Sequence, residues 1–139
     1  MFSNLFSLKP TDAVDEIDEK QAMAALMVRI AKSDDDYAIT ECERIEAILS
    51  VLYSLSPAEA AKLRNQAETL EANAPDTVRF TRAIKDAVPY EGRFEVVRAL
   101  WQVVLADGER DHEEDALMRL LASLLGVNDR DSAIARQRA

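Results

Sequence analysis

The stretch Ala22-Met-Ala-Ala-Leu-Met-Val28 decides the fold, because a helix drawn through it is apolar on every side. A helix of this kind is stable only where neighbouring elements bury it on several sides. Residues 94–105 repeat the character, with an apolar stripe at helical spacing that further valines and an alanine widen. The sequence therefore predicts two central buried helices, over about residues 11–33 and 90–106, with Met27 and Trp101 in the core.

Amphipathic helices are expected around this central pair. Apolar residues at spacings of three and four predict helices over about residues 41–54 and 112–125. Caps, prolines and a glycine set the other boundaries. We expect N-caps at Thr11 or Asp12, Ser56 (with Pro57 first in its helix), Asp76, and Asn128 or Asp129, and helix ends before Pro75, before Pro89 and at Gly126. No segment has a period of two, so the fold class is all-α, in a single domain.

The composition limits the class of function. The chain has 139 residues with only 3 glycines and 4 prolines, which favours helices over a turn-rich β-fold. Its 26 acidic residues outnumber its 17 basic ones, a net charge of −9. An acidic chain repels nucleic acid, so cations or a basic protein surface are the expected partners. No apolar run is long enough for a transmembrane segment, and the expected location is cytoplasmic.

Residues 1–10 are expected to form a tail or a short helix beside a helical domain over residues 11–139. Phe2, Leu5, Phe6 and Leu8 make this segment apolar. It has no basic region and no small-residue cleavage site, so we do not interpret it as a signal peptide. Packing onto the edge of the domain is one interpretation, and contact with a partner or a membrane is the other.

Cys42 is the only cysteine and His112 the only histidine. One residue of each kind excludes a disulfide framework and any Cys-cluster or multi-His zinc site. No oxyanion hole, third catalytic group or glycine-rich loop accompanies this pair. The chain is therefore not expected to be an enzyme.

The two halves of the chain share a layout, which predicts an internal duplication. Apolar positions of the long helices match at an offset of 74 residues, as in Met27 and Trp101, and those of the following helices match at 72, as in Ile45 and Leu117. Two such units would pack around a pseudo-twofold axis. The alternative is chance similarity, because any two amphipathic helices share a 3.6-residue period.

Two acidic segments recur at the same place in each half. Residues 34–46 and 107–115 hold 12 of the 26 acidic residues. Both contain the frame Asp-x3-(Thr/Asp)-x2-Glu, given by Asp36, Thr40 and Glu43 and by Asp107, Asp111 and Glu114. One interpretation is structural: Thr40 and Asp111 would cap the next helix in a capping box, and acids suit the first turn of a helix.

Capping does not explain Asp34, Asp35, Asp36, Asp107 or Glu109. These residues follow the C-terminus of a long helix, where the helix dipole disfavours carboxylates. Gathered carboxylate oxygens form a hard environment that Ca²⁺ or Mg²⁺ would neutralise. The spacing is not that of an EF-hand, since the twelfth position after Asp107 is Met118. The candidate metal ligands are Asp35, Asp36, Glu43, Asp107, Glu109, Asp111 and Glu114, and solvated acidic caps remain the alternative.

Several motifs resemble the TerB-like proteins of bacterial tellurite resistance. They are Asp36-Tyr-Ala-Ile-Thr-Glu-Cys-Glu-Arg44, residues 79–84, residues 99–101, Ala106-Asp-Gly-Glu-Arg-Asp111 followed by Glu113-Glu114, and Leu124-Leu-Gly-Val127. The resemblance covers about residues 15–130. It implies about seven helices with internal pseudo-symmetry and a role in metal or oxyanion stress. It also implies divalent-metal binding by acidic residues, carried over to Asp36, Glu43, Asp107, Asp111 and Glu114.

Two functional hypotheses follow. The first is a non-enzymatic metal-binding stress module. The second is a protein-interaction scaffold whose acids are solvated or contact a basic partner. Loss of a Ca²⁺-specific stabilisation in Asp107→Asn would separate the two, and Glu71→Gln, remote from both segments in sequence, is the expected neutral control.

Overall fold

The computed structural model describes residues 17–33, 37–107 and 112–139, with backbone alone at residues 107 and 112–114. All of its regular elements are helical, and no strand occurs among the described residues. The elements are α3 (Glu19–Lys32), α4 (Ile39–Tyr53), α5 (Pro57–Ala72), α6 (Val78–Ala87), α7 (Tyr90–Val104), the short 3-10 helix η1 (Leu105–Asp107), α8 (His112–Leu124) and α9 (Asp129–Gln137). The predicted all-α class and the number of helices are confirmed.

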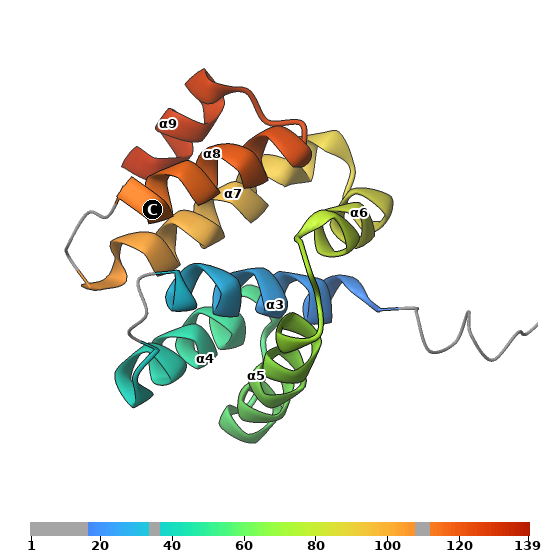
Figure 1. Cartoon of the computed structure of the whole chain (residues 1–139), viewed down its shortest axis with the longest axis vertical. Coiled ribbons are helices and arrows are strands. Elements are labelled where there is room, and N and C mark those ends of the chain that lie inside the picture. The colour runs from blue at the N-terminus through green and yellow to red at the C-terminus, as the bar shows by residue number, and fades with distance from the viewer. Residues whose placement is uncertain (1–16, 34–36, 108–111) are drawn as a thin grey trace, which may run out of the picture.

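The two predicted central helices form the middle of the molecule. Helix α3 packs against α4, α5, α6, α7 and α8, and α7 packs against α3, α4, α8 and α9 (Figure 1). Residues 22–28 are all fully buried, Met27 among them, and Trp101 is 7% exposed. The Trp101 Nε1 donates to the Ser132 hydroxyl of α9, 3.1 Å away, so its one polar group is satisfied inside the core.

The first long helix is shorter than the sequence analysis predicts. Residues 1–16, with Thr11 and Asp12, lie outside the described part of the chain. Helix α3 begins at Glu19, after Asp18 in an extended conformation, and the Asp18 carboxylate accepts from the Gln21 amide at 2.7 Å. Gln21 in turn accepts from the Asp18 amide, which completes a capping box that we had not predicted.

The predicted N-cap of the second helix is wrong by two residues. Helix α4 begins at Ile39 after Ala38, so Thr40 lies inside the first turn. Glu41, rather than Glu43, reaches back to accept from the amide of the residue before the helix, 3.2 Å from Ala38 N. The side chain of Ala38 has no oxygen that could accept from an amide of the first turn. Of the two hydrogen bonds of a capping box, this helix start has only the one from the Ala38 amide to Glu41. The matching cap Asp111 lies outside the described residues.

The other caps largely follow the sequence. Ser56 Oγ accepts from the Glu59 amide and Glu59 accepts from the Ser56 amide, with Pro57 first in α5. Asn128 caps α9, with its side chain 2.7 Å from the Asp131 amide. Asp76 is one residue early, because Thr77 occupies the N-cap of α6 while Asp76 accepts from Val78.

The outer helices bury less than their apolar stripes predict. Leu52 of α4 and Leu120 of α8 belong to the apolar stripes that predict these helices, and Leu105 ends the stripe of the second central helix, but each is exposed, Leu120 by 50%. Met118 is fully buried in α8 instead. A stripe wider than one contact face leaves its edge in solvent, so periodicity alone cannot say which edge is covered.

The two halves repeat one local detail closely, although the duplication and its pseudo-twofold axis stay a prediction. Ser54 after α4 and Gly126 after α8 are the described residues with a left-handed backbone, and they are 72 positions apart. The Leu55 amide then bonds to the Ser50 carbonyl, and the Val127 amide to the Ala122 carbonyl. Both helices therefore end in the same turn, which leads directly into α5 and α9.

Candidate functional site

Described residues within or next to the two acidic segments meet at one edge of the molecule. The C-terminus of α3, the N-terminus of α4, and η1 all lie on the same side, at the left of Figure 1. Arg44 of α4 donates through its Nη1 to the carbonyl oxygen of Ala106, which directly precedes the second segment. A small cavity of about 60 Å³ lies at this contact, between α4 and the end of α7.

Most predicted metal ligands cannot be placed. Glu43 lies on α4, exposed to solvent. Asp35, Asp36, Glu109 and Asp111 lie outside the described residues, as do the side chains of Asp107 and Glu114. Within the described part of the chain, no three Asp, Glu, His or Cys side chains gather in a way that would hold a metal ion. The structure thus brings the start of α4 next to Ala106, the residue before the second acidic segment. The set of metal ligands stays a prediction.

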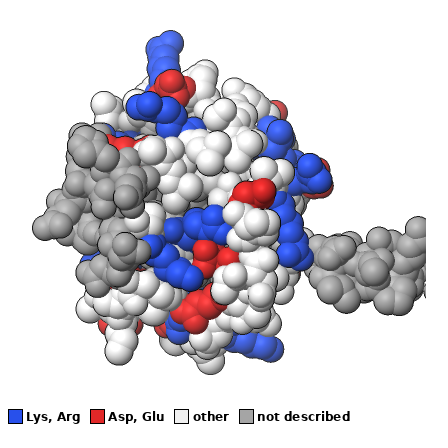
Figure 2. Space-filling view, in the orientation of Figure 1, with Lys and Arg blue, Asp and Glu red and all other residues white. Residues whose placement is uncertain are grey.

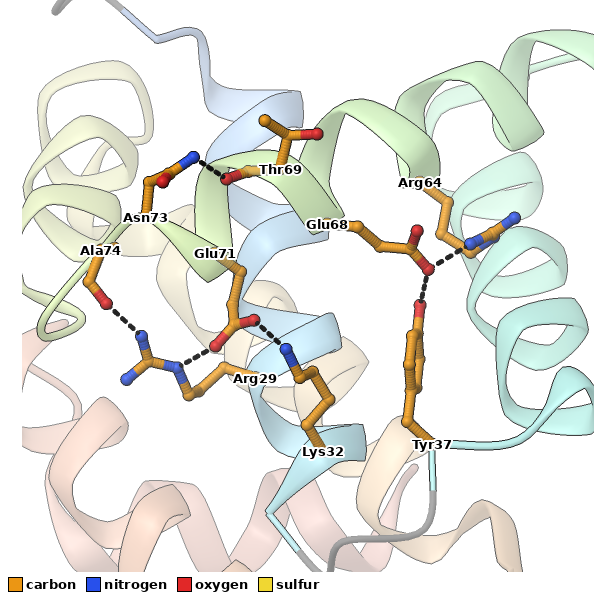
Figure 3. A network of polar contacts seen from close by, with 9 residues as sticks. All are labelled: Arg29, Lys32, Tyr37, Arg64, Glu68, Thr69, Glu71, Asn73 and Ala74. Atoms are coloured by element: carbon orange, nitrogen blue, oxygen red, sulfur yellow. Dashed lines mark hydrogen bonds and ion pairs between the residues drawn. The ribbon is translucent and has the colours of Figure 1, made fainter.

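The flank before the first acidic segment is held by a buried ion pair on α5. Glu71 accepts from Arg29 Nε at 2.7 Å and from Lys32 Nζ at 2.8 Å (Figure 3), and its side chain is 8% exposed. Arg29 also donates to the carbonyl oxygen of Ala74, 2.9 Å away, beyond the end of α5. These contacts fix the last turn of α3, next to the acidic segment.

Tyr37 and Glu46, within the first acidic segment, are held by a second network on the same helix. The Tyr37 hydroxyl donates to Glu68 Oε2 at 2.6 Å, and Arg64 donates to the same oxygen (Figure 3). Arg64 Nε also pairs with Glu46 of α4 at 2.6 Å. Burial raises the pKa of Tyr37, and its hydrogen bond to Glu68 raises it further, so the phenol stays protonated.

These two networks hold both ends of residues 34–36 on one face of α5. Glu68 and Glu71 are three residues apart, so they lie on the same side of the helix. Figure 2 shows the result on this face, where basic and acidic side chains lie next to one another rather than in separate patches. Glu71 is therefore not remote from the first acidic segment, and the expectation that Glu71→Gln is a neutral control is wrong.

Sequence reasoning missed this pair of networks. One signal was available: Arg29 is the single charged residue in the otherwise apolar run 22–31. A charged group in such a run needs a partner, because an unpaired buried charge is costly. The identity of the partner, 42 residues away, was not readable from the sequence.

The Cys42 and His112 pair is only half described. Cys42 is a free, partly buried thiol in the first turn of α4, and its side chain contributes to the raised pKa of Tyr37. The side chain of His112 is outside the described residues.

No helix among the described residues is long and apolar enough to cross a bilayer. No curated protein sequence and no solved structure matches the chain at a significant level. The family model described as "Tellurite resistance protein TerB" matches residues 20–137, a span that runs from the start of α3 to the end of α9 and takes in all eight helical elements. This match covers most of the chain and agrees with the acidic frames and the two long central helices. The chain therefore belongs to the TerB family.

Proposed function

We propose that this chain is a non-enzymatic module of a metal or oxyanion (tellurite) stress response, and that it binds a divalent cation at its two acidic segments. The proposed ligands are Asp35, Asp36 and Glu43 in the first segment and Asp107, Glu109, Asp111 and Glu114 in the second. Carboxylate oxygens in this number suit a hard cation, Ca²⁺ or Mg²⁺.

The observation that carries the proposal is the contact between Arg44 and the carbonyl oxygen of Ala106. Arg44 lies within the first segment, next to Glu43, and Ala106 directly precedes Asp107, so this bond joins the first segment to the residue before the second. Twelve acidic residues in two such short stretches repel one another, and a bound cation would relieve that repulsion. The networks of Glu68 and Glu71 support the proposal too, because a held backbone lowers the entropy lost on binding.

The test is thermal unfolding in Ca²⁺, with Mg²⁺, Mn²⁺ and Zn²⁺ in parallel. With a dissociation constant on the order of 0.1 mM, about 1 mM Ca²⁺ stabilises the fold by about 1.4 kcal/mol. For a domain of this size, that raises the Tm by about 4–7 °C. Screening of the −9 charge also stabilises, so NaCl at matched ionic strength is the reference.

Charge-neutral variants separate a site from general screening. Asp107→Asn keeps the side-chain shape and removes one proposed ligand, so most of the Ca²⁺-specific increment should disappear. Asp86→Asn is the matched control, because Asp86 is exposed on α6. Helix α6 lies on the side of the molecule opposite the acidic edge (Figure 1). An unchanged increment in Asp107→Asn, or equal responses to Ca²⁺ and NaCl, would contradict metal binding and favour solvated caps that contact a basic partner.

A further inference from the structure

A groove between α4 and α7 is left open by the described residues. At one end, Ile48, Val51 and Leu52 of α4 face Ala99 of α7 around a cavity of about 170 Å³, whose lining also includes Glu95, Arg98 and Gln102 of α7. Val51 is 86% exposed there. A smaller cavity beside Arg44 lies between the same two helices, toward the N-terminus of α4. An uncovered, partly apolar groove between two helices is suited to a short helical or extended segment.

The corresponding groove in the second half of the chain is covered. Helix α6 leads into α7 and packs against both α3 and α8. Phe80 is its main anchor and is fully buried. Helices α8 and α4 correspond at an offset of 72 residues, with matching turns at Gly126 and Ser54. In this correspondence α3 matches α7 and α4 matches α8. The segment that precedes α3 would therefore cover α4 and α7 as α6 covers α8 and α3.

The segment that precedes α3 is residues 1–16, and its chemistry fits. At the 74-residue offset of the long helices, Phe80 corresponds to Phe6. Residues 1–8 hold Phe2, Leu5, Phe6 and Leu8 and have no charged side chain. An uncharged apolar segment gains from burial against the aliphatic side chains on the α4 side of the groove.

The open end of the groove also lies close to where this segment joins the domain. The Tyr53 hydroxyl of α4 is 3.2 Å from Glu19 Oε2 at the start of α3, and Lys20 lies over the Tyr53 ring. Tyr53 directly follows Leu52, so the apolar end of the groove is next to the start of α3. Residues 9–16 can span up to about 28 Å, which is enough to bring residues 2–8 into the groove.

We propose that residues 2–8 of the same chain dock in the groove between α4 and α7, with Phe6 as the anchor that Phe80 is for α6. A second groove also opens near Ile17, between the start of α3 and α6, with a volume of about 870 Å³. Its lining includes six charged residues, Asp18, Glu19, Asp76, Arg79, Arg82 and Asp86, against Glu95 and Arg98 in the groove between α4 and α7, so it suits an uncharged apolar segment less well. The proposal is independent of metal binding.

Paramagnetic NMR on the full chain tests the docking. A nitroxide is attached at Ser3→Cys in a Cys42→Ser background, so that the label has a single site. Amides of residues 48–52 and 95–102 should lose most of their intensity, while those of residues 78–87 should not. Val51→Glu places a charge in the groove and should restore the intensities, whereas the matched change Val78→Glu, on α6 at the other groove, should leave them reduced.

Three outcomes would overturn the proposal. Intensity loss centred on residues 17–19 and 78–87 would put the segment in the charged groove. Loss at no folded residue would mean that the segment does not dock. Intensity loss in a mixture of ¹⁵N-labelled, unmodified chains and spin-labelled, unenriched chains would mean that it docks on a second copy rather than on its own chain.

Discussion

Glu71 accepts a hydrogen bond from Arg29 with their atoms 2.7 Å apart, in a place where the carboxylate is almost fully buried. The pair joins α5 to the last turn of the central helix α3, and Lys32 binds the other carboxylate oxygen. Glu71 thus neutralises both Arg29 and Lys32. These two basic side chains therefore compensate less of the negative charge of the first acidic segment.

Removing this carboxylate should be costly. Glu71→Gln leaves Arg29 and Lys32 without a charged partner, and breaking a buried pair in this way costs about 3 kcal/mol. Urea unfolding measures the change, with Asp86→Asn as an exposed control expected to shift the free energy of unfolding by less than about 0.5 kcal/mol. Equal stability in the two variants would mean that the pair contributes nothing to the fold.

The caps give a prediction that separates the structure from the sequence pattern. Ser56→Ala and Asn128→Ala should each lower the free energy of unfolding by about 1 kcal/mol, because each removes an oxygen that accepts from an amide of the first turn. Thr40→Ala should be close to neutral, since Thr40 lies inside α4 rather than at its N-cap. Thermal melts of the three variants decide between this helix start and the one predicted from the sequence, for which Thr40→Ala would cost as much as the others.

The matched helix ends predict changes of opposite sign. Ser54 has a φ of 56° and Gly126 a φ of 78°, a conformation that costs a residue with a Cβ about 1 kcal/mol. Ser54→Gly should therefore stabilise the protein slightly, and Gly126→Ala should destabilise it by about 1 kcal/mol. Chemical denaturation of both variants is the measurement, and a destabilised Ser54→Gly would show that its side chain contributes more than the strain.

Alkaline pH should weaken the fold through Tyr37. Its pKa in the folded state is raised, by burial first and by Glu68 second, above the unfolded value of about 10. A raised pKa means that the folded state holds the proton more tightly, so this contribution is complete below about pH 10 and is lost as pH rises further. Tyr37→Phe has no proton to lose.

The free energy of unfolding, followed by urea denaturation from pH 8 to about pH 11, should fall less steeply in Tyr37→Phe than in the unchanged protein. Burial and the charge of Glu19 raise the pKa of Tyr53 in the same direction, so some alkaline loss should persist in the variant. Identical slopes would mean that Tyr37 does not couple ionisation to folding.

The sequence by itself determined the helices and the centre of the core. Ser56-Pro57, Asn128 and Gly126 act on amides and carbonyls within a few residues, so their effect was readable locally. The run 22–28 left a helix no polar face, so it had to be buried. Recurrence of the acidic frames, with the helices between them, also carried the resemblance to the TerB family.

Only the tertiary structure decided which partners meet. The pairing of Arg29 with Glu71 depends on how α3 and α5 cross, and the exposure of Leu52 and Leu120 depends on which edge of each stripe a neighbour covers. The contact between Arg44 and Ala106 brings together residues 62 positions apart. Side-chain periodicity fixes a face but not what lies against it, because packing between helices is set by every neighbour at once.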